Sequence, residues 1–540
     1  MEATVKTVSG NIVDVMSTEL YPGTITIAGG TIAAITRDRE EYDTFILPGF
    51  VDSHVHIESS MLPPSEFARA AVVHGTVAAV SDPHEIANVM GADGVAYMIH
   101  DGTTVPMKFC FGAPSCVPAT GFETSGAVLN AEAVKTLLER DDITYLAEMM
   151  NFPGVIHNDP EVMEKIRHAR DCGKPIDGHA PGLRGDDLQR YKDAGISTNH
   201  ECLSRDEVVE NIRAGMKVQL RKGSAADIFD TCIDLIDQYP DSLMLCSDDK
   251  HPDDLVRGYL NDMVRIAVAR GIDIFNILKV ASVNPVVHYG LDVGLLRRGD
   301  PADFLVVDNL IDFTILKTYI DGQIVARTGT TMIPRQQPAA INRFAALSKE
   351  PSGFSVLYTT DNLPVIVAVD GQLVTERIAV APTVEHGHIV SDVARDILKI
   401  AVVNRYQDTK PAIGFIKNFG LREGAIASSV AHDCHNIVAV GVRDDDLCTA
   451  VNRIIQEKGG ICAVSGGNQA VLPLPIAGIM STDDYHAVAR KYTELDGMAK
   501  SMGSRLRAPF MTLSFMALPV IPKLKMTDRG LFDAEAFEYV

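Results

Sequence analysis

Between residues 44 and 291, short apolar segments of strand type alternate with longer helix-compatible segments such as 65–73 and 206–214. Apolar runs of this length, rich in β-branched residues and ended by polar or turn residues, predict strands. We expect eight strands, and a β/α alternation over about 250 residues is typical of a (β/α)8 barrel. The expected strands are 45–56, 75–83, 105–114, 143–151, 175–180, 196–200, 217–224 and 242–249.

The two ends of this segment have a different pattern. Residues 1–44 form short β segments around Gly29-Gly30, and similar segments return at 303–308 and 318–325. This pattern predicts one small β-sandwich domain split into 1–44 and 292–345, with the barrel at 45–291 inserted; two unrelated hairpins are the alternative. Residues 346–540 mix strand patterns at 362–371 and 437–442 with a helix pattern at 446–458. The expected fold class is therefore α/β: a TIM-like barrel, a split β-sandwich domain and an additional C-terminal α+β domain.

The composition narrows the possible partners and the location. Lys and Arg total 49 against 71 Asp and Glu, which gives a formal net charge of −22. Such a charge disfavours nucleic acid and membrane as partners. The N-terminal segment lacks the pattern of a secretory signal, and no run approaches the ~18 apolar residues of a membrane span. Nine cysteines, an odd number, suit reduced thiols and a cytoplasmic location.

Several strand ends carry residues that bind metals. His54 and His56 lie two apart in an expected strand, so both imidazoles can point into the same cavity. The alternative for such a pair is two surface histidines. The C-terminal ends of barrel strands form the catalytic face, and imidazole and carboxylate groups bind Zn, Fe and Mn. Four more candidate ligands end later strands: Glu148, His179, His200 and Asp248.

A hydrolase needs an open metal position for water, so six ligands fit two cations better than one. Glu148 is the residue placed to bridge them, and Asp248 could bind a metal and also accept and return a proton. For Asp248 and Asp249, the alternative is a pair of N-cap residues before the next helix; Asp249 could be no more than that.

Other charged groups are less distinctive. His84 follows the second expected strand, where it could touch substrate or support a ligand, and Glu85 is expected to be a carboxylate in the first turn of a helix. His432 and His435 could bind a metal, but their spacing fits no standard zinc pattern, and a turn explains them at least as well. The P-C-x-x-C motif of the cytidine-deaminase signature is absent, so that zinc-binding fold is not supported. The G-x-S-x-G motif is absent too, which disfavours serine esterase chemistry.

Longer sequence strings resemble a known family. The strings PGFVDSHVH (48–56) and GLLRRGDPADFLVVD (294–308) are similar to those of the amidohydrolase superfamily. More narrowly, the chain resembles the microbial adenine deaminases in HVHIESSMLPPSEFARAAVVHGTVAAVSDPHEIANVMG (54–91) and FGLREGAIASSVAHDCHNIVAVG (419–441). The resemblance extends across essentially the whole chain.

The resemblance implies hydrolytic deamination of adenine to hypoxanthine and ammonia by a metal-bound hydroxide, in purine salvage. It also implies a binuclear divalent metal site, with Mn2+ expected and Fe2+ or Zn2+ as alternatives. The implied ligands are His54, His56, Glu148, His179, His200 and Asp248, and Glu148 replaces the lysine of other branches.

Attack of water at C6 of adenine also requires proton transfers. We expect Asp248 to relay the proton to ammonia, and Glu148 or His84 to protonate the ring. The alternatives are a hydrolase of cyclic amides, similar to dihydropyrimidinase or imidazolonase, or a catalytically inactive metal-binding protein. Adenine is the expected small-molecule partner, and we expect a homo-oligomer, specifically a dimer.

Overall fold

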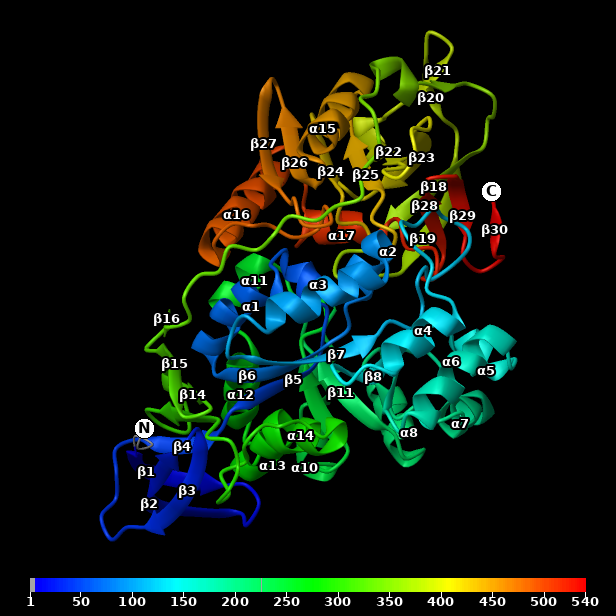
Figure 1. Cartoon of the computed structure of the whole chain (residues 1–540). Coiled ribbons are helices and arrows are strands. Elements are labelled where there is room, and N and C mark those ends of the chain that lie inside the picture. Colours follow the sequence, from blue (N-terminus) through cyan, green and yellow to red (C-terminus); the bar gives the residue numbers. More distant parts are fainter. Residues whose placement is uncertain (1–4, 225) are drawn as a thin grey trace.

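Figure 1 shows the computed structural model, which describes residues 5–224 and 226–540. A small β-sheet region lies at one end of the molecule, the barrel lies in the middle, and the third region lies at the other end. Residues at the ends of barrel strands and residues of the third region line one cavity, so the barrel mouth faces that region.

The expected eight-stranded barrel is confirmed. The parallel strands form two ladders, with orders β5-β6-β7-β8-β9 and β10-β11-β12. Backbone hydrogen bonds between Ser197 N and Ile176 O (2.9 Å) and between Asp248 N and His54 O (3.0 Å) join the ladders and close the barrel. The strands are β5 (Phe50–Val55), β6 (Thr76–Ser81), β7 (Lys108–Ala113), β8 (Ile143–Met149), β9 (Ile176–Gly178), β10 (Thr198–Asn199), β11 (Lys217–Arg221) and β12 (Leu243–Cys246).

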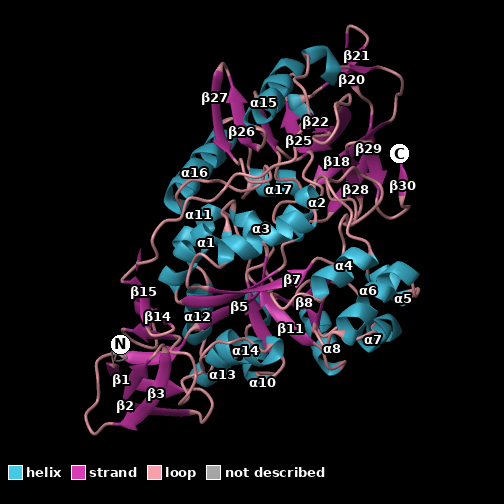
Figure 2. Cartoon of the chain, viewed as in Figure 1, coloured by secondary structure: helices cyan, strands magenta, loops and turns pink. Residues whose placement is uncertain are grey.

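Helices follow each strand and surround the barrel, as Figure 2 shows. Their apolar faces bury residues such as Phe67 and Leu260 against the strands, which is the usual stabilisation of this fold. The helices are α1 (Pro64–Ala71), α2 (His84–Met90), α3 (Ala92–Gly102), α4 (Ala131–Leu138), α5 (Phe152–Ile156), α6 (Pro160–Asp171), α7 (Gly185–Asp193), α8 (Arg205–Arg213), α9 (Phe229–Cys232), α10 (Leu235–Gln238), α11 (Pro252–Arg257), α12 (Leu260–Ala269), α13 (Ile274–Leu278) and α14 (Asn284–Tyr289).

The expected strand at 45–56 is two strands. β4 (Phe45–Pro48) pairs with strands of the small sheet, whereas β5 belongs to the barrel. Gly49 separates them, and a Cβ on Gly49 would lie 2.4 Å from the Cγ atoms of Val77. The chain thus enters the barrel at Gly49 rather than at residue 45, because the change of sheet requires backbone to approach β6 closely.

Gly49→Ala is expected to destabilise the fold by about 1–3 kcal/mol, because Val77 is fully buried and has little room to move. Urea unfolding measures the change. Gly497→Ala is the matched control: Gly497 is an exposed residue of α16 (Tyr485–Ser501) with no atom close to its Cβ position. That variant should gain about 0.5–1 kcal/mol. Equal stability of the two variants would contradict the close packing at Gly49.

The two β-rich ends share one sheet, which excludes two unrelated hairpins. Its order is β16-β15-β14-β13-β4-β1-β2-β3, so the expected sandwich is one continuous hydrogen-bonded sheet. β4 joins the two ends of the chain, because it pairs with β1 on one side and with β13 on the other. The other strands are β1 (Lys6–Asp14), β2 (Glu19–Ala28), β3 (Thr31–Arg37), β13 (Phe304–Val307), β14 (Ile315–Ile320), β15 (Gln323–Arg327) and β16 (Thr330–Thr331).

The third region is built on a second eight-stranded sheet of order β19-β18-β23-β22-β25-β24-β26-β27. The expected helix at 446–458 is α15 (Asp444–Glu457), which packs on this sheet; α16 and α17 (Pro509–Phe515) complete the helices. The strands are β18 (Leu363–Ala368), β19 (Thr375–Val380), β22 (Ile397–Val403), β23 (Ala412–Lys417), β24 (Ala425–Ser428), β25 (Ile437–Gly441), β26 (Gly460–Ser465) and β27 (Asn468–Pro473).

Two three-stranded sheets flank it. They contain β17 (Val356–Leu357), β20 (Thr383–Glu385) and β21 (His388–Val390), and β28 (Leu524–Thr527), β29 (Gly530–Asp533) and β30 (Glu538–Tyr539).

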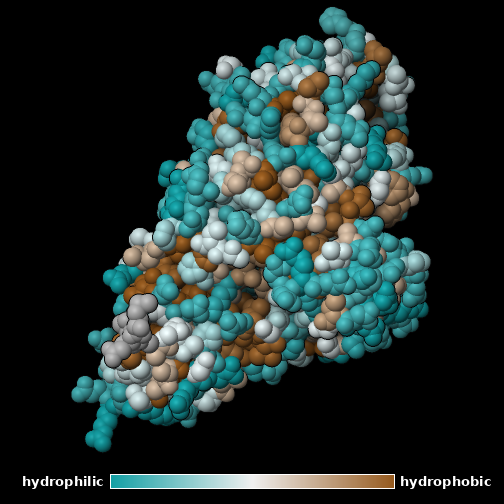
Figure 3. Space-filling model, viewed as in Figure 1, coloured by the Kyte–Doolittle hydropathy of each residue, from teal (hydrophilic) through white to brown (hydrophobic). Residues whose placement is uncertain are grey.

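The face shown in Figure 3 is mostly hydrophilic, and its apolar residues lie in separate groups, which fits a net charge of −22. Among residues 5–224 and 226–540, no helix combines the length and the apolar character that a bilayer span needs.

Candidate functional site

The structure brings together all six residues that the sequence singled out as candidate ligands. His54 lies on β5 and Glu148 on β8, while the other four follow their strands directly or by one residue. Parallel strands of a barrel end on the same face, so residues distant in sequence converge there. All six are buried or nearly so: His54, His56, Glu148, His179, His200 and Asp248.

Three of them form one group. His54 Nε2 lies 3.2 Å from His56 Nε2, and Asp248 Oδ1 lies 3.6 and 3.2 Å from these two nitrogens. Asp248 has φ +55°, and its N–H donates to His54 O while its carbonyl accepts from His56 N–H. This backbone pairing with β5 holds the Asp248 carboxylate against both imidazoles.

Glu148 connects this group to a second one. Its Oε2 lies 3.0 Å from both His179 Nδ1 and His200 Nε2, while its Oε1 lies 3.5 Å from His56 Nε2. Each carboxylate oxygen therefore faces a different set of imidazoles. This is the placement that a bridging ligand requires.

The nitrogens and oxygens in these groups are arranged to bind cations rather than to form hydrogen bonds with one another. Glu148 Oε2 is buried and forms no hydrogen bond, although two ring nitrogens lie 3.0 Å away. His56 Nδ1 faces Asp82 O at 3.1 Å, which leaves the Nε2 lone pair directed into the site. Imidazole with carboxylate is a donor set that Mn, Fe and Zn accept, so the residues fit a divalent metal site.

A buried arginine controls the charge of Asp248. Arg221, at the end of β11, donates from Nη1 to Asp248 Oδ2 at 2.6 Å and also contacts Glu201. Burial raises the pKa of Asp248, but the Arg221 guanidinium and the neighbouring imidazoles of His54 and His56 together hold that pKa well below its usual range. The sequence analysis did not single out Arg221 or Glu201. A signal for Arg221 was present, because it is a charged residue within the seventh expected strand.

Glu148 is held in its ionised form as well. Burial raises the pKa of Glu148, but His179 and His200 hold it well below its usual range.

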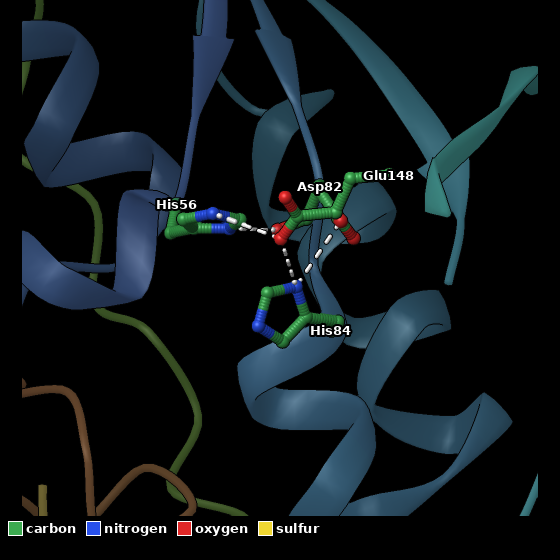
Figure 4. A group of neighbouring side chains, drawn as sticks. All are labelled: His56, Asp82, His84 and Glu148. Carbon is green, nitrogen blue, oxygen red and sulfur yellow. Dashed lines mark hydrogen bonds and ion pairs between the residues drawn. The ribbon is translucent and has the colours of Figure 1, made fainter. Parts of the chain in front are cut away.

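His84 lies at the start of α2, beyond the end of β6, and Figure 4 shows how it contacts the site. Its Nδ1 lies 3.1 Å from Asp82 Oδ2 and 3.4 Å from Glu148 Oε1. The side chain therefore contacts Glu148 from the side away from His179 and His200. Its other ring nitrogen, Nε2, points away from Glu148.

The third region contributes polar groups to the same site. His432 and His435 lie in a turn, as expected, but both are buried, and both contact the carboxylate of Glu85. Glu85 is indeed in the first turn of α2. No pattern in the sequence indicates that these residues meet, because 347 positions separate Glu85 from His432.

Asp249 is not an N-cap residue. The cap of α11 is His251, and Asp249 is buried and accepts a hydrogen bond from Ser59 Oγ. The N-cap prediction for Asp249 was wrong because the helix begins two residues later than that prediction requires.

A cavity lies over these groups, between the barrel mouth and the third region. Its polar side includes the metal-ligand candidates, and its other side is apolar: Met150, Leu373, Phe515, Leu518 and Ile521. Four of these five apolar residues come from the third region, so that region forms part of the site.

Comparisons with known proteins agree with this architecture. Residues 45–325 match the Amidohydrolase family, and residues 372–538 match the adenine deaminase C-terminal domain. A curated adenine deaminase of Salinibacter ruber is 55% identical over 99% of this chain and 98% of its own length. That of Methanosarcina mazei is 52% identical, with 98% of both chains covered, and that of Borreliella burgdorferi is 47% identical, with 99% of both covered.

Proposed function

Since the chain belongs to the adenine deaminase family of amidohydrolases, we propose that it hydrolyses adenine to hypoxanthine and ammonia, in purine salvage. The observation that carries this proposal is the convergence of six ligand-type side chains beneath a cavity with an apolar side. A flat purine ring needs apolar walls over its faces and polar groups at its reacting edge.

We propose two divalent cations for the site, with Mn2+ expected and Fe2+ or Zn2+ as alternatives. His54, His56 and Asp248 would hold one, His179 and His200 the other, and Glu148 would bridge them. When bound, such metals supply a nucleophile at neutral pH by lowering the pKa of a water molecule toward about 7.

Asp248 and His84 have different roles in this proposal. Through Oδ1, Asp248 would accept the proton of the attacking water and return it to the departing ammonia. His84, through Nδ1, holds the Glu148 carboxylate in position. The lowered pKa of Glu148 favours a ligand over an acid that protonates the ring.

The apolar side of the cavity would bind the purine. Met150 projects from the barrel, and Leu373, Phe515, Leu518 and Ile521 come from the third region. Phe515 is fixed by stacking on His432, with 4.4 Å between ring centroids and an interplanar angle of 11°. The third region thereby supplies walls that the barrel lacks on its own.

The experiment that tests this function compares two substrates on one manganese-loaded preparation. We expect ammonia and hypoxanthine from adenine, and no ring opening of a cyclic amide such as dihydrouracil. Ring opening without adenine turnover would support a cyclic-amide hydrolase instead. A metal-loaded protein inert to both substrates would support a binding protein.

A homodimer and a cytoplasmic location both stay predictions.

A further inference from the structure

A second group of titratable side chains lies beside the six candidate ligands, where α2 meets the turn of the third region. It contains His84 and Glu85 from α2, and His432 and Asp433 from the turn. All four are at most 3% exposed. Glu85, His432 and Asp433 have no role in the proposed metal pair or in the proposed proton transfers.

His84 is oriented as a metal ligand would be. Its Nδ1 faces Asp82 Oδ2 at 3.1 Å, so a carboxylate accepts from one ring nitrogen and leaves the other for a ligand. A histidine that binds a metal almost always donates its second ring nitrogen to such an acceptor. The other ring nitrogen, Nε2, points away from Glu148 (Figure 4) and lies on the side of Asp433 in the third region.

Two carboxylates face that nitrogen. Glu85 Oε1 lies 3.4 Å and Asp433 Oδ1 3.9 Å from His84 Nε2, and the three ligand atoms all lie within 4.8 Å of one another. His432 Nδ1 contacts the same Glu85 oxygen. One nitrogen and two carboxylate oxygens, from two domains, therefore lie around one point, and His432 lies next to one of those oxygens.

Among the described residues, Asp433 Oδ2 is buried without a hydrogen-bond partner. Asp433 is 2% exposed, and a buried carboxylate oxygen without a partner is costly unless a cation lies against it. Burial raises the pKa of Asp433 to about 6. Asp249 and Glu58 are also buried nearby, where burial and the neighbouring carboxylates raise the pKa of both carboxyl groups.

We propose that His84, Glu85 and Asp433, with His432 as a fourth ligand, bind a further divalent cation that fastens the third region to the barrel mouth. The mixed imidazole and carboxylate donors suit Mn2+, Fe2+ or Zn2+. His435 supports the site without binding the ion: Ala431 N–H donates to its Nδ1, so its Nε2 carries the proton and faces Glu85 Oε2 at 2.5 Å.

The test is a count of bound Mn2+ on the full chain after chelator treatment, by equilibrium dialysis with elemental analysis. We expect three ions per wild-type chain and two in Asp433→Asn. Asp444→Asn is the matched control, because this carboxylate of the same region pairs with Lys399, and it should keep three. Two ions per wild-type chain, or three in Asp433→Asn, would overturn the proposal.

Crystals of the wild-type protein with Mn2+ provide a second measurement, which does not depend on the variant folding. An anomalous peak among His84, Glu85 and Asp433 is expected, and a third peak elsewhere, or none, would overturn the site. Neither measurement uses adenine, so failure of the proposed function and failure of this site are distinguishable.

Discussion

Asp248→Asn is expected to lower kcat for adenine by about 10²–10⁴-fold, the usual contribution of a general acid or base. An amide has nearly the shape of the carboxylate but cannot accept the proton of the attacking water. Arg221, which donates to Asp248 Oδ2 at 2.6 Å, would also lose one of its two charged partners and keep the other, Glu201. The measurement is ammonia release from adenine, together with the metal content and the melting temperature of the same preparation.

The metal content separates the two roles of Asp248. If the variant keeps its metal but loses turnover, the proton role is supported; if it loses metal, the loss reflects the ligand role. Asp262→Asn is the control, since that partly exposed carboxylate pairs with Arg265 on the outer helix α12 and should leave turnover unchanged. A wild-type rate in Asp248→Asn would exclude Asp248 as proton carrier.

Glu148→Gln is expected to have the second large effect: it should weaken the binding of both cations. Each Glu148 oxygen faces a different group of imidazoles, so removing the charge weakens both halves of the site. Replacing even a supporting group next to a metal typically costs about 10–100-fold in affinity, and we expect a larger loss here. Elemental analysis after dialysis against a weak chelator measures the loss, with adenine turnover recorded in parallel.

Glu164→Gln provides the control for this variant. Glu164 lies on the exposed side of α6, where it pairs with Arg167, and its loss should change neither metal content nor rate. Retention of both metals by Glu148→Gln would show that Glu148 does not bridge them.

The sequence predicted the barrel and the six converging side chains because both depend on local patterns. Each strand has its own apolar run, and ligand-type residues lie at the ends of those runs, as with Glu148 and His179. Since parallel strands end on one face, six local observations predict one site. The resemblance to a family strengthened this prediction but was not needed for the geometry.

Features that depend on contacts between distant segments could not be predicted in this way. The apolar run at 45–56 is continuous in sequence, and its division at Gly49 follows from the packing of Val77. The meeting of Glu85 with His432 joins residues 347 positions apart in two different domains. The sequence pattern of neither segment indicates that it contacts the other, so only the packed structure shows that the third region helps to form the site.

Restoring activity to a metal-free preparation tests the central claim most directly. The protein is stripped with a chelator, manganese is added stepwise, and hypoxanthine formation from adenine is measured at each step. Turnover should be absent without metal and should return only as manganese is bound. Undiminished turnover in the stripped protein, or no hypoxanthine from the fully loaded protein, would contradict an adenine deaminase built on these six side chains.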